Sequence, residues 1–380
     1  MENAKYRMLL ESLKKDILGG KYTLEQPFPS VRALSRRFGL ANTTVQRAVE
    51  ALVQQGLVQR SQGAGSVVTR TGALRKIGLI VPGIAVSEFF RPVVTTLIRL
   101  AQENGYTLLF GETYSNDPAK RVREARELAA EMIKNHVAGV LYQPFEAASN
   151  GMAMNQRILS VLGAKKIPVV LLDRDAVMPP ERTAHDLVAI NNVDAGERLA
   201  RHMVAAGARR IGFLTRFTDV PNIESRLRGF LCAKAVLESQ RVRFEVFRGA
   251  ADDKTFIRRK MKGRNPPDAI VCDSDTTAAM LRQTLGDLGY SVPDDVRIAG
   301  FDDVRLASLM TPPLTTIRQP CEEIAEQAFR RLLARVQKPD LVPLEILIAA
   351  PLVVRASTMR RGGNSVRENK AKEKAKRRVP

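Results

Sequence analysis

The chain has 380 residues, of which 44% are hydrophobic, and a formal net charge of +20. This length is enough for two or three ordinary domains, and the positive charge indicates a polyanionic partner. Residues 1–75 carry 12 Lys/Arg against 5 Asp/Glu, and residues 360–380 carry 9 against 2, whereas the long middle is nearly neutral. We therefore expect nucleic-acid binding from the ends of the chain and a globular body between them.

The cysteines and histidines are few and far apart. Cys232, Cys272 and Cys321 are odd in number and widely spaced, which is typical of a reducing compartment and argues against a disulfide scaffold or a zinc site. No stretch approaches the ~18–20 apolar residues of a membrane span, and the N-terminus lacks the apolar core of a signal peptide. A cytoplasmic protein without metal, cofactor or membrane partner is expected.

The first 70 residues predict three helices and a hairpin. Residues 4–18 have helical apolar spacing, Ser30 is a candidate N-cap for a second helix, and Gly39 ends that helix. Asn42 is the candidate N-cap of a third helix with a buried stripe of Val45, Ala48, Val49 and Leu52. The segments LVQR and SVVT on either side of SQGAG predict a two-stranded hairpin. Residues 1–70 are thus expected to form a winged helix-turn-helix domain.

The start of the third helix carries short polar side chains suited to DNA. A helix that enters the major groove presents its first turn to base edges and phosphates. Gln46 can bond adenine and Arg47 can bond guanine or phosphate, while glycines at the hairpin tip allow close approach of the backbone. The predicted DNA contacts are Arg32, Asn42, Thr43, Thr44, Gln46, Arg47, Gln62 and Gly63. The alternative is that the polar run only caps the helix and the arginines are solvated.

This segment resembles the winged helix-turn-helix of the GntR family. The pattern P-S-x-R-x-L, then T-T-V-x-R-A, then G-L-V and Q-G-x-G extends over nearly the whole segment. The resemblance implies operator contacts at Arg32, at residues 42–44, at Gln46 and at the wing around Gln62. Arginine is usual in the family at position 42 and common at position 46, so Asn42 and Gln46 are expected to alter the base preference.

From residue 76 the pattern changes to alternating buried strands and helices. Strands are expected at KIGLIVP, TLLF, AGVLY, IPVVLLD, RIGFL, DAIVC and VRIAGF, with helices between them. Such β–α repetition predicts parallel sheets covered on both faces, and the length favours two lobes. The expected α/β body spans residues 76–359, after a linker at 71–75. Residues 360–380 are expected to form a disordered basic tail that adds DNA affinity or only improves solubility.

The body resembles the LacI/GalR sensor domain, which is similar to periplasmic sugar-binding proteins. The passages RKIGLIVP, IPVVLLDRD, ESRLRGF and SVPDDVRIAGFDDVRLASLMTPPLTTIRQP carry the resemblance. It implies two α/β lobes with three chain crossings, near 190, 317 and 340, and a small-molecule site in the cleft. The combination of the two domains resembles the arabinose repressor subfamily.

Acidic residues at strand ends support a ligand site in that cleft. Open α/β sheets bind ligands at the carboxyl ends of their strands, where Asp173 and Asp302 lie. The resemblance implies effector contacts at Ser87, Glu88, Phe89, Phe90, Asp173, Arg226, Ser274 and Asp302. Asparagine is usual in the family at position 274. Each residue also has a structural interpretation, as a surface ion pair, a turn cap, a solvated helix face or a core aromatic.

The leading hypothesis is a transcription regulator, most simply a repressor. A homodimer would bind double-stranded operator DNA, and a small effector, a mono- or disaccharide, would control its affinity. A solute-binding protein is opposed by the DNA-binding head and the missing signal peptide. An enzyme is not expected, because the sequence has no P-loop, metal-ligand spacing or G-x-S-x-G motif.

Overall fold

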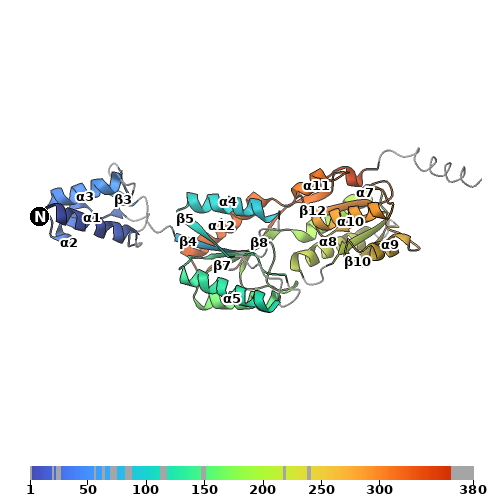
Figure 1. Ribbon diagram of the computed structural model, residues 1–380, viewed down its shortest axis with the longest axis horizontal. Coiled ribbons are helices and arrows are strands. Elements are labelled where there is room, and N and C mark those ends of the chain that lie inside the picture. The colour runs from blue at the N-terminus through green and yellow to red at the C-terminus, as the bar shows by residue number, and fades with distance from the viewer. Residues whose placement is uncertain are drawn as a thin grey trace, which may run out of the picture. The chain divides into compact units, whose positions relative to one another are not determined.

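The computed structural model describes residues 2–18, 21–22, 27–54, 57–61, 65–68, 75–81, 88–111, 118–146, 151–216, 220–237 and 241–360 (Figure 1). The chain divides into two compact units, residues 1–76 with 101–107 and residues 77–100 with 108–380. Of the predicted features, Gln62, Gly63 and Ser87 lie outside the described residues. The same is true of the linker except Arg75 and of the tail except Arg360. Among the described helices, none has the length and apolar character needed to cross a membrane.

The amino-terminal unit contains the three predicted helices, α1 (Glu2–Leu18), α2 (Val31–Phe38) and α3 (Asn42–Gln54). Ser30 caps α2, because its Oγ accepts a hydrogen bond of 3.2 Å from the backbone N–H of Ala33. Gly39 ends α2 with a φ of +63°, a conformation that favours glycine. The predicted stripe on α3 is buried and packs with apolar residues of α1 and α2, among them Leu9, Leu13, Ile17 and Leu34.

One prediction about α3 is wrong. Asn42 is the first residue of the helix and not its N-cap, since the backbone N–H of Val45 donates to the carbonyl of Ala41 at 3.1 Å. Ala41 therefore occupies the capping position, where its side chain can accept no hydrogen bond. The Asn42 side chain is exposed, and the helix start leaves it available for other contacts.

The predicted hairpin consists of β2 (Val58–Ser61) and β3 (Gly65–Val68), which pair antiparallel. A third strand, β1 (Pro27–Phe28), pairs antiparallel with β3. The sequence did not predict β1, because two residues are too few to show an alternating pattern. Together the three helices and this small sheet form a winged helix-turn-helix.

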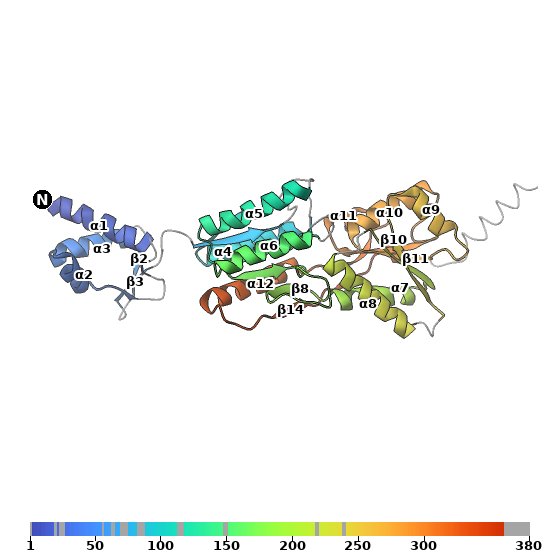
Figure 2. The same cartoon turned by 90° about the horizontal axis from the view of Figure 1, so that it is seen from below.

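The first lobe, most of which belongs to the second unit, has a six-stranded sheet in the order β14-β8-β7-β6-β4-β5, and the strands from β14 to β4 are parallel. Its strands are β4 (Arg75–Ile80), β5 (Tyr106–Gly111), β6 (Val140–Tyr142), β7 (Val169–Leu172), β8 (Asp186–Ile190) and β14 (Glu345–Ile348). Its helices are α4 (Phe90–Glu103), α5 (Pro118–Lys134), α6 (Gly151–Ala164) and α12 (Cys321–Gln337). Helices α4 and α5 lie on opposite faces of the sheet (Figure 1), and α5 packs beside α6 (Figure 2).

The second lobe has a sheet in the order β10-β9-β11-β12-β13-β15, which is parallel except for β15. Its strands are β9 (Arg210–Thr215), β10 (Arg243–Arg248), β11 (Ala269–Cys272), β12 (Arg297–Asp302), β13 (Thr315–Arg318) and β15 (Leu352–Val353). Its helices are α7 (Asn192–Ala205), α8 (Pro221–Leu237), α9 (Lys254–Lys262), α10 (Asp275–Asp287), α11 (Arg305–Leu309) and the 3₁₀ turn η2 (Ala356–Thr358). The expectation of parallel sheets covered by helices is confirmed.

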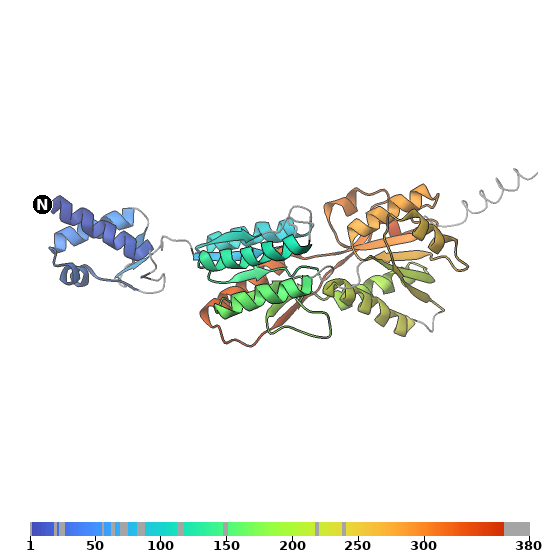
Figure 3. The same cartoon turned by 60° about the horizontal axis from the view of Figure 1, so that its bottom comes forward.

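The chain crosses between the lobes three times (Figure 3). The first crossing lies between β8 and α7, at Asn191, and the second between β13 and α12, at residues 319–320, close to the predicted positions. The third prediction, near 340, is wrong. After α12 the chain first adds β14 to the sheet of the first lobe and crosses only at residues 349–351, before β15.

A buried carboxylate anchors α12 within the first lobe. Asp186 is 0% exposed and accepts hydrogen bonds from Arg331 Nε at 2.8 Å, from Arg335 Nε and from the backbone N–H of Leu344 at 2.7 Å. Burial by itself would raise the pKa of Asp186, but these donors outweigh it and hold the pKa below its ordinary value. The cluster joins β8, α12 and the segment that leads into β14.

We predict that Asp186→Ala destabilises the protein by about 3–5 kcal/mol, since it leaves two largely buried guanidinium groups, those of Arg331 and Arg335, without a carboxylate. The free energy of unfolding, measured by urea titration at pH 7, tests this. The control is Asp287→Ala, which removes an exposed ion pair with Lys254 and should cost less than about 1 kcal/mol. Equal losses in the two variants would contradict the anchoring role.

Candidate functional site

Helix α3 presents one polar face to solvent. Asn42, Thr43, Gln46 and Arg47 are exposed, whereas the opposite face is buried in the core of the unit. Thr44 differs from the other predicted contacts, because only 7% of it is exposed. Arg32 is exposed on α2. The predicted DNA-contacting residues therefore share one accessible helix face, apart from Thr44, which faces inward.

Two of these side chains are already held by neighbours. Gln46 Nε2 donates to Glu50 Oε1 at 3.3 Å, and Glu50 also accepts from Arg60 of β2 at 3.2 Å. The guanidinium of Arg47 lies 5.4 Å from the centre of the Tyr6 ring. These contacts give α3 and the wing a shared polar surface.

In the second unit, a cavity of about 700 Å³ lies between the two lobes. Residues from the carboxyl ends of several strands contribute to its wall, as expected for an open parallel sheet. Of the predicted effector residues, Glu88, Phe89, Asp173, Arg226, Ser274 and Asp302 line the cavity. Phe90 does not; it is 1% exposed and packs in the core against Phe89, with ring centres 5.3 Å apart.

Arg226 donates a hydrogen bond from each of its three guanidinium nitrogens. Its Nε donates to Asn192 Oδ1 at 3.0 Å, its Nη1 to the carbonyl of Asp273 at 2.6 Å, and its Nη2 to Asp302 Oδ1 at 3.1 Å. The guanidinium also lies 4.6 Å from the centre of the Phe301 ring. Since Arg226 is only 3% exposed, these partners compensate the cost of burying its charge.

The close packing of α7 on α8 sets the position of Arg226. A Cβ added to Gly196 of α7 would lie 2.0 Å from the Arg226 carbonyl oxygen, and one added to Gly229 of α8 would lie 1.9 Å from that of Val193. Only glycine permits this approach of the two backbones. The helical pattern of the sequence did not reveal this requirement.

Asp173 links the two lobes on the other side of the cavity. Its carboxylate accepts from Gln143 Nε2 of the first lobe at 3.0 Å and from Asn222 Nδ2 of the second lobe at 3.1 Å. Arg174 Nη1 lies 3.6 Å from the same carboxylate. An effector that bonds Asp173 would therefore compete with, or add to, a contact that bridges the lobes.

Asp173 and Asp302, the two carboxylates at strand ends, both have positive φ angles. Asp173 has a φ of +68° and Asp302 a φ of +107°, which are costly for residues with a side chain. Asp302 is held by Arg226 and by Gln319 Nε2 at 3.0 Å. Strained positions with charged side chains are found more often at functional sites than elsewhere.

Ser274 has a local structural role as well. Its Oγ accepts from the backbone N–H of Thr277 at 3.2 Å, which caps α10, and it donates to Asp273 Oδ1 at 3.2 Å. A hydroxyl has one proton and two acceptor lone pairs, so one lone pair of Ser274 is still available to a ligand donor while the cap is kept.

The sequence did not single out several polar residues of the cavity wall, namely Gln143, Glu146, Arg216, Asn222, Asp252, Asp273 and Gln319. Gln143, Arg216 and Asp273 directly follow β6, β9 and β11. They could have been predicted, because open α/β sheets bind ligands at the carboxyl ends of their strands. Gln319 Oε1 is buried without a hydrogen-bond partner among the described residues. This acceptor is suited to a hydroxyl donor from a ligand.

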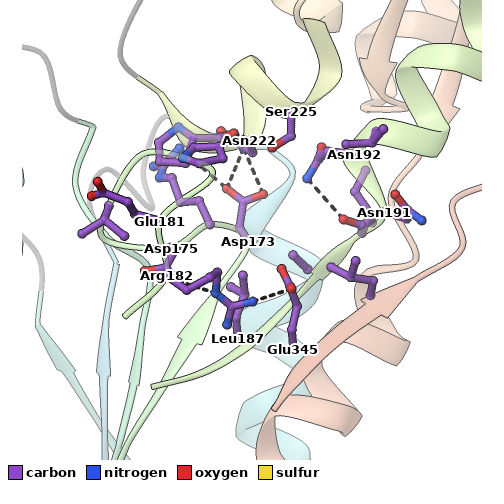
Figure 4. Close-up of a pocket in the computed structure, with 18 residues that line it drawn as sticks. Asp173, Asp175, Glu181, Arg182, Leu187, Asn191, Asn192, Asn222, Ser225 and Glu345 are labelled. Atoms are coloured by element: carbon purple, nitrogen blue, oxygen red, sulfur yellow. Dashed lines mark hydrogen bonds and ion pairs between the residues drawn. The ribbon is translucent and has the colours of Figure 1, made fainter. Parts of the chain in front are cut away.

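A smaller pocket of about 120 Å³ lies beside the crossing at Asn191, and Asp173 contributes to its wall too (Figure 4). Arg182 spans its rim, with Nε 2.9 Å from Asp175 and Nη1 2.5 Å from Glu345. Figure 4 shows Asp173 turned toward Asn222. The polar groups at this rim bond one another. We therefore interpret the pocket as part of the joint between the lobes at Asn191 and not as a ligand site.

Beneath the cavity lies a buried carboxylate with a raised pKa. Burial and the neighbouring Asp302 raise the pKa of Asp275 to about 8. Asp275 accepts from Thr316 Oγ1 at 2.6 Å and from the backbone N–H of Val304 at 3.1 Å. Within the described part of the chain, no group of His, Cys, Asp and Glu side chains has the arrangement of a metal site.

Comparison with known proteins agrees with this architecture. Residues 5–68 match the family of bacterial regulatory proteins called the gntR family, and residues 200–358 match the periplasmic binding protein-like domain. The chain therefore combines a GntR-type DNA-binding domain with a periplasmic-binding-protein-like domain, and it is an effector-controlled DNA-binding transcription regulator. Both resemblances inferred from the sequence are confirmed.

The similar proteins include repressors named for sugar metabolism. The arabinose metabolism transcriptional repressor of Geobacillus stearothermophilus is 27% identical over 368 residues, which cover 93% of this chain and 97% of the relative. The ribose operon repressor of Bacillus subtilis is 26% identical, covering 75% of this chain and 81% of the relative. The fold is similar to that of a LacI family regulator from Enterococcus faecium solved with bound ribose, with a TM-score of 0.60, 21% identity and coverage of 76% and 100% of the two chains.

We predict that Asp275 makes a contribution to the stability of the protein that is lost as pH rises from about 4 to 8. The folded protein disfavours ionised Asp275, so the stabilising contribution of the protonated form is complete below the ordinary pKa of 3.8 and is lost by about pH 8. Melting temperatures across this range test the prediction. As pH rises, the melting temperature of Asp275→Asn should fall less steeply than that of the wild type. The melting temperature of Asp287→Asn should follow the wild type. An unchanged slope in Asp275→Asn would exclude Asp275 as the cause.

Proposed function

We propose that this protein is a transcription repressor whose affinity for operator DNA changes when an uncharged sugar fills the cavity between the lobes. The observation that carries the proposal is the set of strand-end side chains, Asp173, Arg226 and Asp302, that converge on one cavity of about 700 Å³. Hydroxyl groups of a sugar can donate to carboxylates and accept from a guanidinium. Phe89 supplies an apolar surface in the same wall.

The charge of the wall favours a neutral ligand over an anionic one. Six carboxylate side chains and three arginines line the cavity, and Asp302 already pairs with Arg226. A sugar phosphate or sugar acid would therefore meet net negative charge. The relatives named for arabinose and ribose operons and the ribose-bound structural relative support a sugar of this kind.

The bridge between the lobes suggests how binding is transmitted. Asn222 bonds Asp173 across the cavity, and Arg228 Nη2 donates to the carbonyl of Pro179 at 2.8 Å, again from one lobe to the other. An effector that changes these contacts would favour one arrangement of the lobes. It switches DNA binding only if it binds the two arrangements with different affinity.

We further propose that two copies act together in the cytoplasm as a homodimer on a pseudo-palindromic operator. The proposed DNA contacts are Arg32, Asn42, Thr43, Gln46 and Arg47, with the wing around Gln62 and Gly63. Thr44 is proposed to support the helix from its inner side, because it is buried. The match of residues 5–68 to a regulatory family supports this function over that of a solute-binding protein.

We predict that Asp302→Ala abolishes the effector response while operator binding is retained. In the wild type, a sugar from a panel that includes arabinose and ribose should change the operator dissociation constant at least about tenfold, and in Asp302→Ala less than about twofold. Because Ala leaves Arg226 without its carboxylate, Asp302→Asn serves as a milder variant. Asp294→Ala, an exposed acid in the turn before β12, is the control.

Fluorescence anisotropy with labelled operator measures both quantities. If no sugar alters wild-type affinity at any concentration, sensing of sugars by this cavity is excluded. If Asp302→Ala responds like the wild type, the ligand does not depend on this carboxylate.

We predict that Asn42→Arg and Gln46→Arg change which operator sequences are preferred. Selection from randomised duplexes should show altered bases at one or two positions, each worth about 1–3 kcal/mol of discrimination. Arg7→Gln on α1 is the control for a general loss of positive charge. A uniform loss of affinity across all sequences would show that these side chains only position the helix.

A further inference from the structure

A row of basic residues lies at the amino ends of the strands in the second lobe. The cavity of about 700 Å³, here called the effector cavity, lies at the opposite, carboxyl ends of these strands. Arg243 of β10 and Arg210 of β9 are register partners, and Arg297 begins β12 in the same sheet. Asp268, just before β11, is the acid in this row. Its carboxylate accepts from the backbone N–H groups of Arg209 and Arg210, each at 2.9 Å.

The helix dipole explains part of this row. Helices that connect parallel strands run against them, so their negative carboxyl ends reach this edge and attract cations. Arg209 fits this explanation, since its Nη1 donates to the carbonyl of Ala208 at 2.9 Å, close to the end of α7. Lys234 lies in the last turn of α8. Within the described part of the chain, neither Arg210 nor Arg243 donates a side-chain hydrogen bond to a carbonyl, so the helix dipole does not account for these two arginines.

A cavity of about 320 Å³ opens beside these two arginines, lined by residues of β9, β10 and α8 and by Asn265 and Pro267 in the segment after α9. Figure 1 labels β10, α8 and α9 in this lobe. Arg210, Arg243 and Lys234 bring three positive charges to its wall, and Phe244 and Pro267 bring apolar surface. The one acid of the wall, Glu245, is paired with Lys260 at 2.5 Å. We call this cavity the basal pocket. The side chains of its wall carry a net positive charge, whereas those of the effector cavity carry a net negative charge.

Three buried donor atoms at this edge, on Arg210 and Arg297, lack a hydrogen-bond partner among the described residues. Arg210 Nε is buried and has no hydrogen-bond partner among the described residues, and Arg210 Nη2 is 3.9 Å from Asp268, too far for a hydrogen bond. Arg297 is 4% exposed, and its Nε and Nη1 also lack partners within the described ranges. Unpaired buried donors of this kind are costly. Of these two arginines only Arg210 lines the basal pocket, so an anion bound there would offset the cost at Arg210.

We propose that the basal pocket binds a small molecule that carries a phosphate group. Arg210 and Arg243 are placed to donate to the phosphate oxygens, and guanidinium groups suit this geometry because their N–H groups form a planar fork. Lys234 adds a third charge, and Phe244 faces the carbon skeleton of the ligand. This ligand site is separate from the effector cavity and does not depend on the sugar proposed above.

Isothermal titration calorimetry of the full chain at constant ionic strength tests the proposal, first with inorganic phosphate and then with ribose 5-phosphate. Arg243→Gln should weaken binding of both at least about tenfold, the expected effect of losing a charged hydrogen bond. Arg243→Lys should retain more of the affinity. Arg243 is an exposed residue of an edge strand, so these variants should fold, which unchanged melting temperatures will verify.

Two controls separate the basal pocket from other basic surfaces. Arg258→Gln removes an exposed charge from α9 outside the pocket, and Arg32→Gln removes one from the DNA-binding unit; neither should change phosphate affinity. Saturable binding that is lost only in Arg243→Gln supports the proposal. It is overturned if the wild type shows no saturable binding, if Arg243→Gln binds like the wild type, or if Arg32→Gln alone loses binding. Loss of ribose 5-phosphate binding in Asp302→Ala but not in Arg243→Gln would assign the ligand to the effector cavity instead.

Discussion

The buried guanidinium of Arg226 is the constraint on which the second unit's ligand site depends. A buried charge is tolerated only when its donors are bonded, and here the partners come from three places: Asn192 at the start of α7, the Asp273 carbonyl after β11, and Asp302 at the end of β12. Moving any of these elements would expose unpaired polar groups. The interaction therefore fixes the strand ends that form one wall of the cavity, and the glycine contact of α7 with α8 holds Arg226 at the required depth.

Positive and negative side chains lie at opposite ends of the strands in the second lobe. Carboxylates gather at the carboxyl ends of the strands, around the effector cavity, and arginines gather at the amino ends, around the basal pocket. The separation gives the two cavities opposite preferences, one for hydroxyl donors and one for anions. The same principle distinguishes the cavity from the DNA-binding unit, where exposed polar and basic side chains of α3 are suited to the edges of bases and to phosphates.

Much of the site could be anticipated from the position of residues at strand ends. Asp173 and Asp302 directly follow apolar runs in the sequence, Ser274 comes one residue after such a run, and all three line the cavity. Phe90 was expected there too, but the periodicity of α4 places it in the core. Asn222 was missed because its partner Asp173 lies 49 residues away in the chain, and nothing in the local pattern of either segment records that they meet.

The sequence by itself determined the order and type of the domains, their parallel sheets and the helix with the exposed polar face that we propose contacts DNA. These properties depend on local spacing of apolar residues and on capping or turn residues, which are visible in short windows. Only the tertiary structure decided where the third crossing falls, that Asn42 starts α3 without capping it, and which polar side chains share a cavity. Those outcomes depend on strand register and helix packing between distant segments, and the basal pocket belongs with them, since Arg210 and Arg243 become neighbours only when β9 pairs with β10.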